Sequence, residues 1–199
     1  ATGLFLVCDG MGGHRAGEVA SSRTVALIPQ HLAAATAAPT LPLLGPARPE
    51  WSAATNRLAS AVRLANHRVH HEAAHDPAYA GMGTTVVAAW LTGSMVSIAH
   101  VGDSRLYLIR DQAIQLLTRD HSLVQEQVRS GLLTDAQAMR ATHRHVLTRA
   151  VGIHPLVDVE LGEVPFLSGD LFLLCSDGLT AGVSADTILR VLLDLPDPQ

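Results

Sequence analysis

Residues 84–117 read TTVVAAWLTGSMVSIAHVGDSRLYLIRDQAIQLL and set the class of the fold. Apolar and β-branched runs alternate here with short polar breaks at residues 92–94, 102–104 and 111–112. Such breaks every 8–12 residues or so are typical of strands that are joined by tight turns. The segment therefore predicts an antiparallel meander with strands over residues 84–91, 95–101, 105–110 and 113–117.

Two further predicted strands lie far apart in the chain and resemble each other. Residues 4–10 read LFLVCDG, and residues 171–178 read LFLLCSDG. Each is a short apolar run that stops at an Asp-Gly turn signal, as a buried strand does. A third predicted strand covers residues 156–164, where apolar residues alternate with other residues.

Helices are predicted before and after these strands. Residues 51–75 carry apolar residues at three-and-four spacing, which gives the apolar stripe of a packed helix. Four His residues of this segment fall mostly off that stripe, and they indicate either a metal site or a solvated helix face. They are His67, His70, His71 and His75. Other helices are predicted over residues 17–35, 122–130, 134–140 and 184–193. Helices that flank a central run of antiparallel strands indicate an α+β fold with helices packed outside the sheet.

Composition excludes several classes of protein. The chain has 199 residues, which is the size of one ordinary domain, and its 48% hydrophobic and 16% charged residues exclude general disorder. A net charge of −4 argues against a nucleic-acid partner. The apolar runs are far shorter than the roughly 20 residues that span a bilayer, and no signal peptide opens the chain, so we expect no membrane segment and a cytoplasmic location. All 14 basic residues are Arg, which excludes any mechanism that needs a catalytic Lys.

Three Asp residues stand where predicted strands end. Asp9 and Asp177 follow the two matching apolar runs, and Asp103 lies in a break of the meander. A Gly beside each Asp lets a ligand approach the backbone closely. Converging carboxylates repel one another, and a hard divalent cation is their natural counter-ion. Each Asp-Gly or Gly-Asp pair taken alone is also explained as an ordinary turn, so it is their convergence that would indicate a metal site.

Six short motifs follow one another along the chain. They are DGMGGH (9–14) with Gly17-Glu18 after it, GMGTT (81–85), AHVGDSR (99–105), RDHS (119–122), LTRAVG (147–152) and SDGL (176–179). Together they resemble the protein phosphatase type 2C family, the metal-dependent Ser/Thr phosphatases, in its bacterial form. One such motif is a weak signal, whereas six in order extend the resemblance over nearly the whole chain.

The resemblance implies a fold and a domain organisation. The fold is α+β, with a central antiparallel β-sandwich flanked by helices in four α-β-β-α layers. Residues 1–199 would form a single phosphatase-like catalytic domain. The segment at about residues 131–145 corresponds to a variable flap beside the catalytic cleft, where it would contact substrate and contribute to selectivity.

The resemblance also implies a binuclear Mn²⁺ or Mg²⁺ centre with a weaker third ion. Asp9 would bridge two ions, and Gly10 would ligate one of them through its carbonyl. Asp177 would bind the second ion, and Asp103 would help to hold the third. A metal-activated water would then hydrolyse phospho-Ser and phospho-Thr without a phospho-enzyme intermediate. The substrates would be phosphorylated proteins, which are the targets of a cognate Ser/Thr kinase.

Some features of the family pattern have no match. The family's opening strand carries a phosphate-gripping Arg, and its closing strand carries a Gly-x-Asp-Asn motif; Asp194 and Asp197 stand in other contexts. We therefore expect a chain truncated at both ends, with some terminal strands missing. The alternative function is a catalytically weak or inactive phosphatase-like module with a regulatory or binding role.

The proton donor and the RDHS motif leave alternatives open. Met11 stands where some members of the family place a His proposed as general acid, and Met cannot donate a proton. His14 is the candidate catalytic residue for that role, beside a metal-bound water, although a turn residue bonded to the backbone is the alternative. Asp120 and His121 form either a proton relay or a brace for their loop. A phosphohydrolase with an Asp nucleophile is disfavoured, because it needs a second Asp at position 11 and a basic residue, usually Lys.

Overall fold

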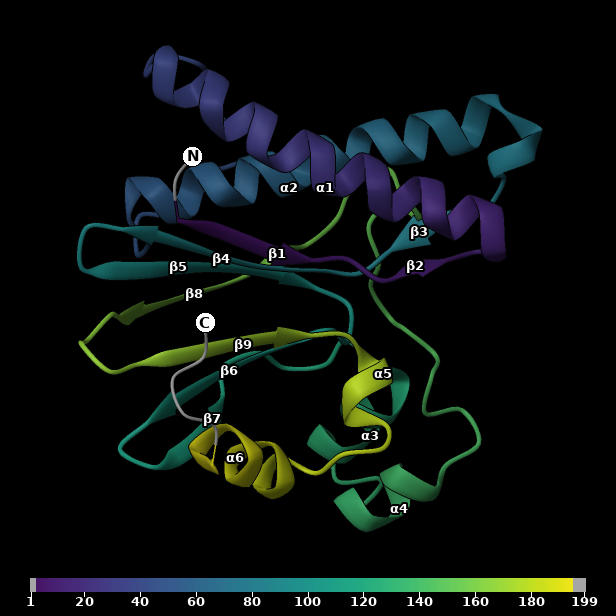
Figure 1. Ribbon diagram of the computed structural model, residues 1–199. Helices are drawn as coiled ribbons and strands as arrows, with labels where there is room; N and C mark the ends of the chain where they lie inside the picture. The colour runs from purple at the N-terminus through teal and green to yellow at the C-terminus, as the bar shows by residue number, and fades with distance from the viewer. Residues whose placement is uncertain (1–2, 195–199) are drawn as a thin grey trace.

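Two antiparallel sheets face each other in the protein, whose computed structural model describes residues 3–194 apart from the side chain of His14 (Figure 1). The first sheet has the order β1-β4-β5-β8, and the second has the order β7-β6-β9. The first consists of β1 (Leu4–Val7), β4 (Val86–Thr92), β5 (Met95–Val101) and β8 (Glu160–Pro165). The second consists of β6 (Arg105–Arg110), β7 (Ala113–Leu116) and β9 (Leu171–Cys175).

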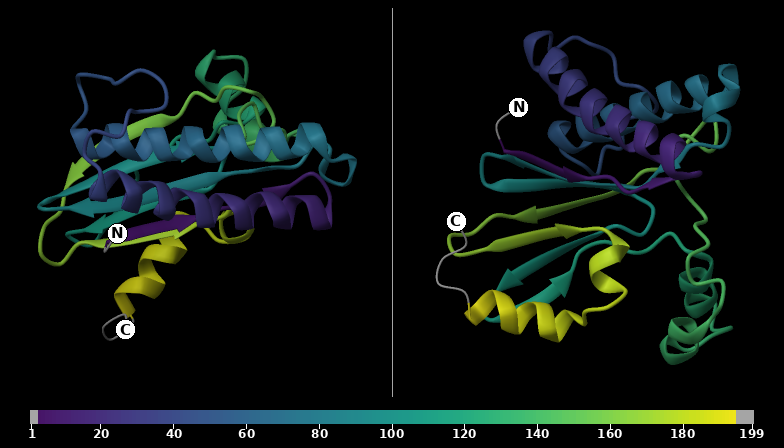
Figure 2. Two further views of the ribbon diagram at one scale, coloured as in Figure 1. Left: turned by 90° about the horizontal axis from the view of Figure 1, so that it is seen from above. Right: turned by 45° about the vertical axis from the view of Figure 1, so that its right-hand side comes forward.

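Helices cover the outer face of each sheet. Two long helices, α1 (His14–Ala37) and α2 (Ala53–His75), lie side by side over the first sheet, as Figure 2 shows from above. The helix α6 (Ala185–Asp194) covers the second sheet. The remaining elements are β2 (Gly10–Met11), β3 (Gly83–Thr84), the 3-10 helix η1 (Pro77–Tyr79), α3 (Leu123–Arg129), α4 (Asp135–Arg140) and α5 (Asp177–Thr180).

Strand β4 shows why the chain forms layers. Successive side chains of a strand point to opposite faces of its sheet. Val86 and Ala88 pack against the core beneath α1 and α2, whereas Val87 and Ala89 pack between the two sheets. Since both faces of this strand are buried, its sequence is a continuous apolar run rather than an alternating one.

Three hydrophobic clusters fill the spaces between four layers. One lies between the helix pair and the first sheet, and one lies between the sheets. The third joins Tyr107 and Ile109 of β6 to Leu189 and Leu192 of α6. The order of layers is therefore α-β-β-α, which confirms the fold expected from the sequence.

The main differences from the predicted elements lie near the second half of the chain. The strand predicted over residues 156–164 begins only at Glu160, because residues 156–159 run outside the ladder and Asp158 pairs there with Arg48 and Arg149. The short helix α5 was not predicted. The long helices and the strands β4, β5, β6 and β7 agree with prediction to within a few residues. The single meander expected of these four strands is wrong, because the turn at residues 102–104 carries the chain from the first sheet to the second, and β5 and β6 do not pair.

Within the described residues, no helix combines the length and the apolar character needed to cross a membrane.

The core between the sheets should be sensitive to a loss of volume. Leu106 is fully buried there. We expect Leu106→Ala to lower the free energy of unfolding by about 2–5 kcal/mol, because it removes buried methyl groups and leaves a cavity. Urea unfolding measures this loss. As a matched control, Leu156→Ala removes the same groups from a side chain that is 86% exposed, and it should cost less than about 0.5 kcal/mol. Equal losses for the two variants would contradict the assignment of the core.

Candidate metal centre

Three strands carry the predicted Asp residues to the same end of the sandwich. Strands β1 and β5 both run antiparallel to β4, and β9 runs antiparallel to β6, which follows β5 through a tight turn. The carboxyl ends of β1, β5 and β9 therefore point the same way. Asp9 follows β1, Asp103 lies in the turn after β5, and Asp177 begins α5 directly after β9. The structure thus brings together three carboxylates that are far apart in sequence.

The backbone of Asp9 is held firmly by two threonines. Its N–H donates to Thr85 Oγ1 at 3.0 Å, and its carbonyl accepts from Thr84 Oγ1 at 2.9 Å and from the Thr85 N–H at 2.9 Å. The next residue, Gly10, is packed so closely on α1 that a Cβ there would overlap the carbonyl of Gly17. Sequence reasoning assigned no role to either Thr, although both belong to the GMGTT motif that it singled out.

The electrostatics of Asp9 and Asp103 indicate that both lie near Asp177. The pKa of Asp9 is raised, first by burial and then by the negative charge of Asp177. The pKa of Asp103 is raised to about 6, again first by burial and then by the charges of Asp177 and Asp120. Both shifts report a place where negative charge accumulates and where a bound cation would relieve the repulsion.

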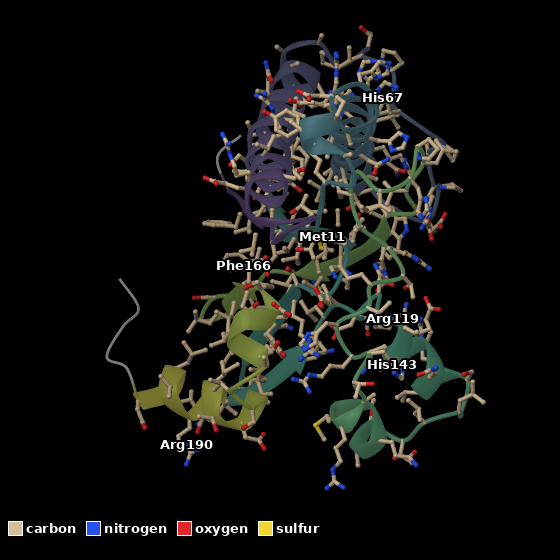
Figure 3. The ribbon with its side chains drawn as sticks, turned by 90° about the vertical axis from the view of Figure 1, so that its right-hand side faces the viewer. Met11, His67, Arg119, His143, Phe166 and Arg190 are labelled. Carbon is tan, nitrogen blue, oxygen red and sulfur yellow. The ribbon has the colours of Figure 1, made fainter. Side chains whose placement is uncertain are left out.

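A cleft of about 540 Å³ opens at this end of the molecule. Asp103 and Asp177 line it, together with Asp120, Arg105 and Ser122. Figure 3 looks onto this end, and Met11 lies near the middle of the view, above Arg119 and His143. The cleft is large enough for a phosphorylated side chain, and a cation bound at its carboxylates would reduce their repulsion of an anionic substrate.

Arg105 is a cationic side chain that lines the cleft, and it already forms an ion pair with Asp120. Its Nε and Nη2 donate to the two carboxylate oxygens of Asp120 at 2.9 and 2.7 Å. This bidentate contact raises the pKa of Arg105 further above its usual range. Asp120 therefore braces its loop against β6. His121 faces other partners, namely the backbone of Gly102 and the carboxylate of Glu160, so the two residues do not form a relay.

The segment at residues 131–145 lies beside the cleft, as expected of a flap. Asp135, Met139, Arg144 and His145 line the cleft from this segment. His145 Nδ1 lies 3.8 Å from Asp177 Oδ2, a neighbour that sequence reasoning missed and that no local pattern would have shown. That this segment selects substrates stays a prediction. His14 begins α1 near this end, but its side chain is outside the described part of the structure, so its catalytic role also stays a prediction.

The four-His helix face is a separate feature. His71 and His75 stack with ring centroids 4.0 Å apart, and both are exposed to solvent. In the part of the chain that the structure describes, these residues form no compact group of three ligands. The solvated-face interpretation therefore fits this surface better than a metal site does.

The residues of the cleft fit a pair of hard divalent cations. The side-chain donors of Asp9, Asp103 and Asp177 are oxygens, which Mn²⁺ and Mg²⁺ prefer. Burial, followed by the negative charge of Asp177, raises the pKa of both Asp9 and Asp103. Among the described residues, the ligand atoms of Asp9, Asp103 and Asp177 do not form a group within 4.8 Å of one another, so they are spread more widely than the ligands of a single ion. Such a spread suits a pair of ions about 3.5–4 Å apart with retained waters.

Comparisons with known proteins agree with this geometry. The family model described as "Protein phosphatase 2C" matches residues 1–194. The Ser/Thr phosphatase stp of Listeria monocytogenes is 40% identical over 95% of this chain, which covers 71% of that protein.

Solved structures are similar over the same range. The Ser/Thr phosphatase PstP/Ppp of Mycobacterium tuberculosis is 34% identical with a TM-score of 0.81, over 96% of this chain and 75% of that one. The catalytic domain of a Ser/Thr phosphatase named PstP, solved in complex with two manganese ions, is also 34% identical, with a TM-score of 0.78 over 97% of this chain and 74% of that one.

The repulsion at Asp103 should make the metal-free protein more stable in mild acid. The folded-state pKa of about 6 exceeds the ordinary value of 3.8, so protonation contributes stability that is fully present below about pH 3.8 and is lost as the pH rises through about 6. Asp103→Asn mimics the protonated form. In EDTA at pH 7 it should raise the free energy of unfolding by about 1 kcal/mol, after allowance for solvent screening.

Urea unfolding of wild type and variant at pH 5 and pH 7 checks this prediction. Asp111→Asn in the exposed turn after β6 is the control, and it should not give this stabilisation at pH 7, because Asp111 lies outside the cleft. If Asp103→Asn destabilises the metal-free protein at pH 7, then Asp103 does not experience the repulsion described above.

Proposed function

The chain belongs to the protein phosphatase 2C family, and on that basis we propose that it is a metal-dependent phosphatase acting on phospho-Ser and phospho-Thr in proteins. The observation that carries the proposal is the meeting of Asp9, Asp103 and Asp177 at one end of the sandwich, beside an acidic cleft. The enzymatic identity of the relatives favours this activity over a non-catalytic regulatory or binding module.

Each of the three carboxylates would take part in binding the cations. Asp9, whose backbone N–H and carbonyl are both hydrogen-bonded, would hold metal ions together with the Gly10 carbonyl. Asp177 and Asp103 would supply further carboxylate oxygens to these ions. When bound, Mn²⁺ or Mg²⁺ ions would lower the pKa of a water and offset the charge of a phosphoryl group. The manganese ions of the PstP structure support this choice of cofactor.

Other residues of the chain would shape the cleft rather than react. The Asp120 carboxylate neutralises Arg105 and keeps its guanidinium directed along the cleft wall. Arg144 and His145 line the cleft from the segment at residues 131–145. These groups would lie near the anionic part of a phosphorylated substrate and help to orient it.

The substrate class follows from the family, whereas finer assignments do not. Phosphoproteins are the substrates of Ser/Thr phosphatases such as the Listeria relative, and we extend this class to the present chain. A cognate Ser/Thr kinase as the source of those phosphoproteins and a cytoplasmic location stay predictions.

Hydrolysis of a phospho-Thr peptide in the presence of Mn²⁺ tests the proposal. We expect turnover with millimolar Mn²⁺, none in EDTA, and recovery when Mn²⁺ is added back. Asp9→Ala should lower kcat/KM at least about 100-fold, because it removes a carboxylate proposed to hold metal ions. His71→Ala is the matched control on the exposed face of α2, and it should keep wild-type activity.

Two results would count against this assignment. Well-folded wild-type protein with no turnover at millimolar Mn²⁺ would support the non-catalytic alternative. Equal losses in the Asp9→Ala and His71→Ala variants would mean that the catalytic centre lies elsewhere.

A further inference from the structure

A second cluster of potential ligands lies behind the cleft. His100 at the end of β5, His121, and Glu160 at the start of β8 place one ligand atom each within 4.8 Å of one another. Both His residues are 1% exposed. Two His and one Glu are a common ligand set for a transition metal such as zinc, so the cluster has to be judged by its hydrogen bonds.

The hydrogen bonds of His121 argue against a metal. Its Nδ1 accepts from the backbone N–H of Gly102 at 3.1 Å, so this nitrogen carries no proton. The ring proton of the neutral imidazole is then on Nε2, which faces Glu160 Oε2 at 3.3 Å. A metal at Nε2 would need that nitrogen to be unprotonated as well, which neutral imidazole does not allow. The cluster is therefore a hydrogen-bonded brace.

His121 grips the turn that carries Asp103 at two points. Besides the bond to Nδ1, the backbone N–H of His121 donates to the carbonyl of Gly102 at 2.8 Å. Both polar backbone groups of Gly102 thus bind the same residue. Gly102 immediately precedes Asp103, so its position sets where that carboxylate begins.

The other side of the turn is closed by Thr85. Gly102 has φ of 109°, and a Cβ there would lie 2.6 Å from Thr85 Cγ2. Thr85 Oγ1 in turn lies 2.6 Å from Ser104 Oγ and accepts the Asp9 N–H. The turn is therefore wedged between His121 and the same Thr that fixes the backbone of Asp9.

Glu160 fixes the ring of His121. The hydrogen bond from His121, followed by the charge of Arg119, lowers the pKa of Glu160 to about 2, so the carboxylate is ionised and favours the proton on Nε2. His100 lies across the ladder from Glu160 and packs its ring 4.7 Å from that of His121. Neither side-chain nitrogen of His100 has a hydrogen-bond partner that meets the distance and angle limits of a hydrogen bond. His100 therefore contributes packing to the brace but no grip on the turn.

We propose that His121 is a positioning residue, which Glu160 orients and which holds the Gly102–Asp103 turn in the place where Asp103 can bind a divalent cation. The inference rests on the proposed function in that Asp103 is taken as a cation ligand. Residues that hold metal ligands in place typically change affinity about 10–100-fold when they are lost.

Calorimetric titration of the metal-free protein with Mn²⁺ tests the proposal. His121→Ala should weaken the site that includes Asp103 by about 10-fold or more. His121→Asn places a carbonyl oxygen near the position of Nδ1, so it can still accept the Gly102 N–H, and it should stay within about threefold of wild type. His121→Gln reaches toward Glu160 instead and should behave like His121→Ala.

His31→Ala is the matched control, because it removes a His whose Nε2 bonds Ser60 between α1 and α2 rather than the turn. It should leave Mn²⁺ affinity unchanged, and the thermal melting of each variant in EDTA shows that it is folded. Wild-type affinity in folded His121→Ala, or an Asn variant as weak as the Ala variant, would overturn the proposal.

Two measurements without metal separate this inference from the proposed function. Ring ¹⁵N shifts should show His121 protonated on Nε2, and the Gly102 amide should exchange faster in His121→Ala than in wild type. A proton on Nδ1, or unchanged exchange, would refute the brace even if the protein is an active phosphatase. Wild-type protein that binds no Mn²⁺ would refute both the cation site and the role of His121 in serving it.

Discussion

Like charges crowd together where β1, β5 and β9 end, and the surrounding backbone does not let them separate. Asp9 is bonded through its N–H and its carbonyl, and Asp103 follows a Gly that is gripped on both sides. Burial removes much of the water that would screen these charges. Binding of a proton or a cation then lowers the repulsion. Burial and the repulsion together raise the pKa values of Asp9 and Asp103.

The two sheets of the sandwich contribute carboxylates from opposite sides, and these carboxylates together form a site for cations. Asp9 comes from the first sheet and Asp177 from the second, and the β5–β6 turn with Asp103 joins them. The three clusters of the hydrophobic core hold the two sheets in fixed positions relative to each other. Ligands that are held before the cation arrives need little reorganisation when it binds, and such preorganisation is what metal catalysis by oxygen ligands requires.

Much of the fold was predictable because its signals are local. The helix over residues 51–75 carries its apolar stripe in its own sequence. Turn residues in the sequence likewise show where the strands β4, β5, β6 and β7 begin and end. The predictions failed where contacts with distant residues decide. Residues 156–159 look like a strand, yet Asp158 pairs with two Arg residues outside the ladder. Helix α5 is only one turn long, which is too short for any periodic pattern.

The candidate site was predictable in part for the same reason. An apolar run that ends in Asp-Gly shows a carboxylate at a strand end, and the order of six motifs indicates the family. No local pattern shows that Arg105 forms an ion pair with Asp120. Nor does any local pattern show that His121 binds Gly102 rather than forming a proton relay with Asp120. Both partners of each contact are visible in the sequence, but their pairing is not.

The amino-acid sequence by itself therefore determined which segments are strands and helices, and which of them end in carboxylates. It did so because periodicity and turn chemistry act over a few neighbouring residues. Only the tertiary structure decided that Asp9, Asp103 and Asp177 meet at one end of the sandwich beside the cleft, and that His121 braces the turn between the sheets. The three Asp residues stand more than seventy positions apart, and His121 is 19 positions from Gly102, so both outcomes depend on strand register and sheet packing rather than on local patterns.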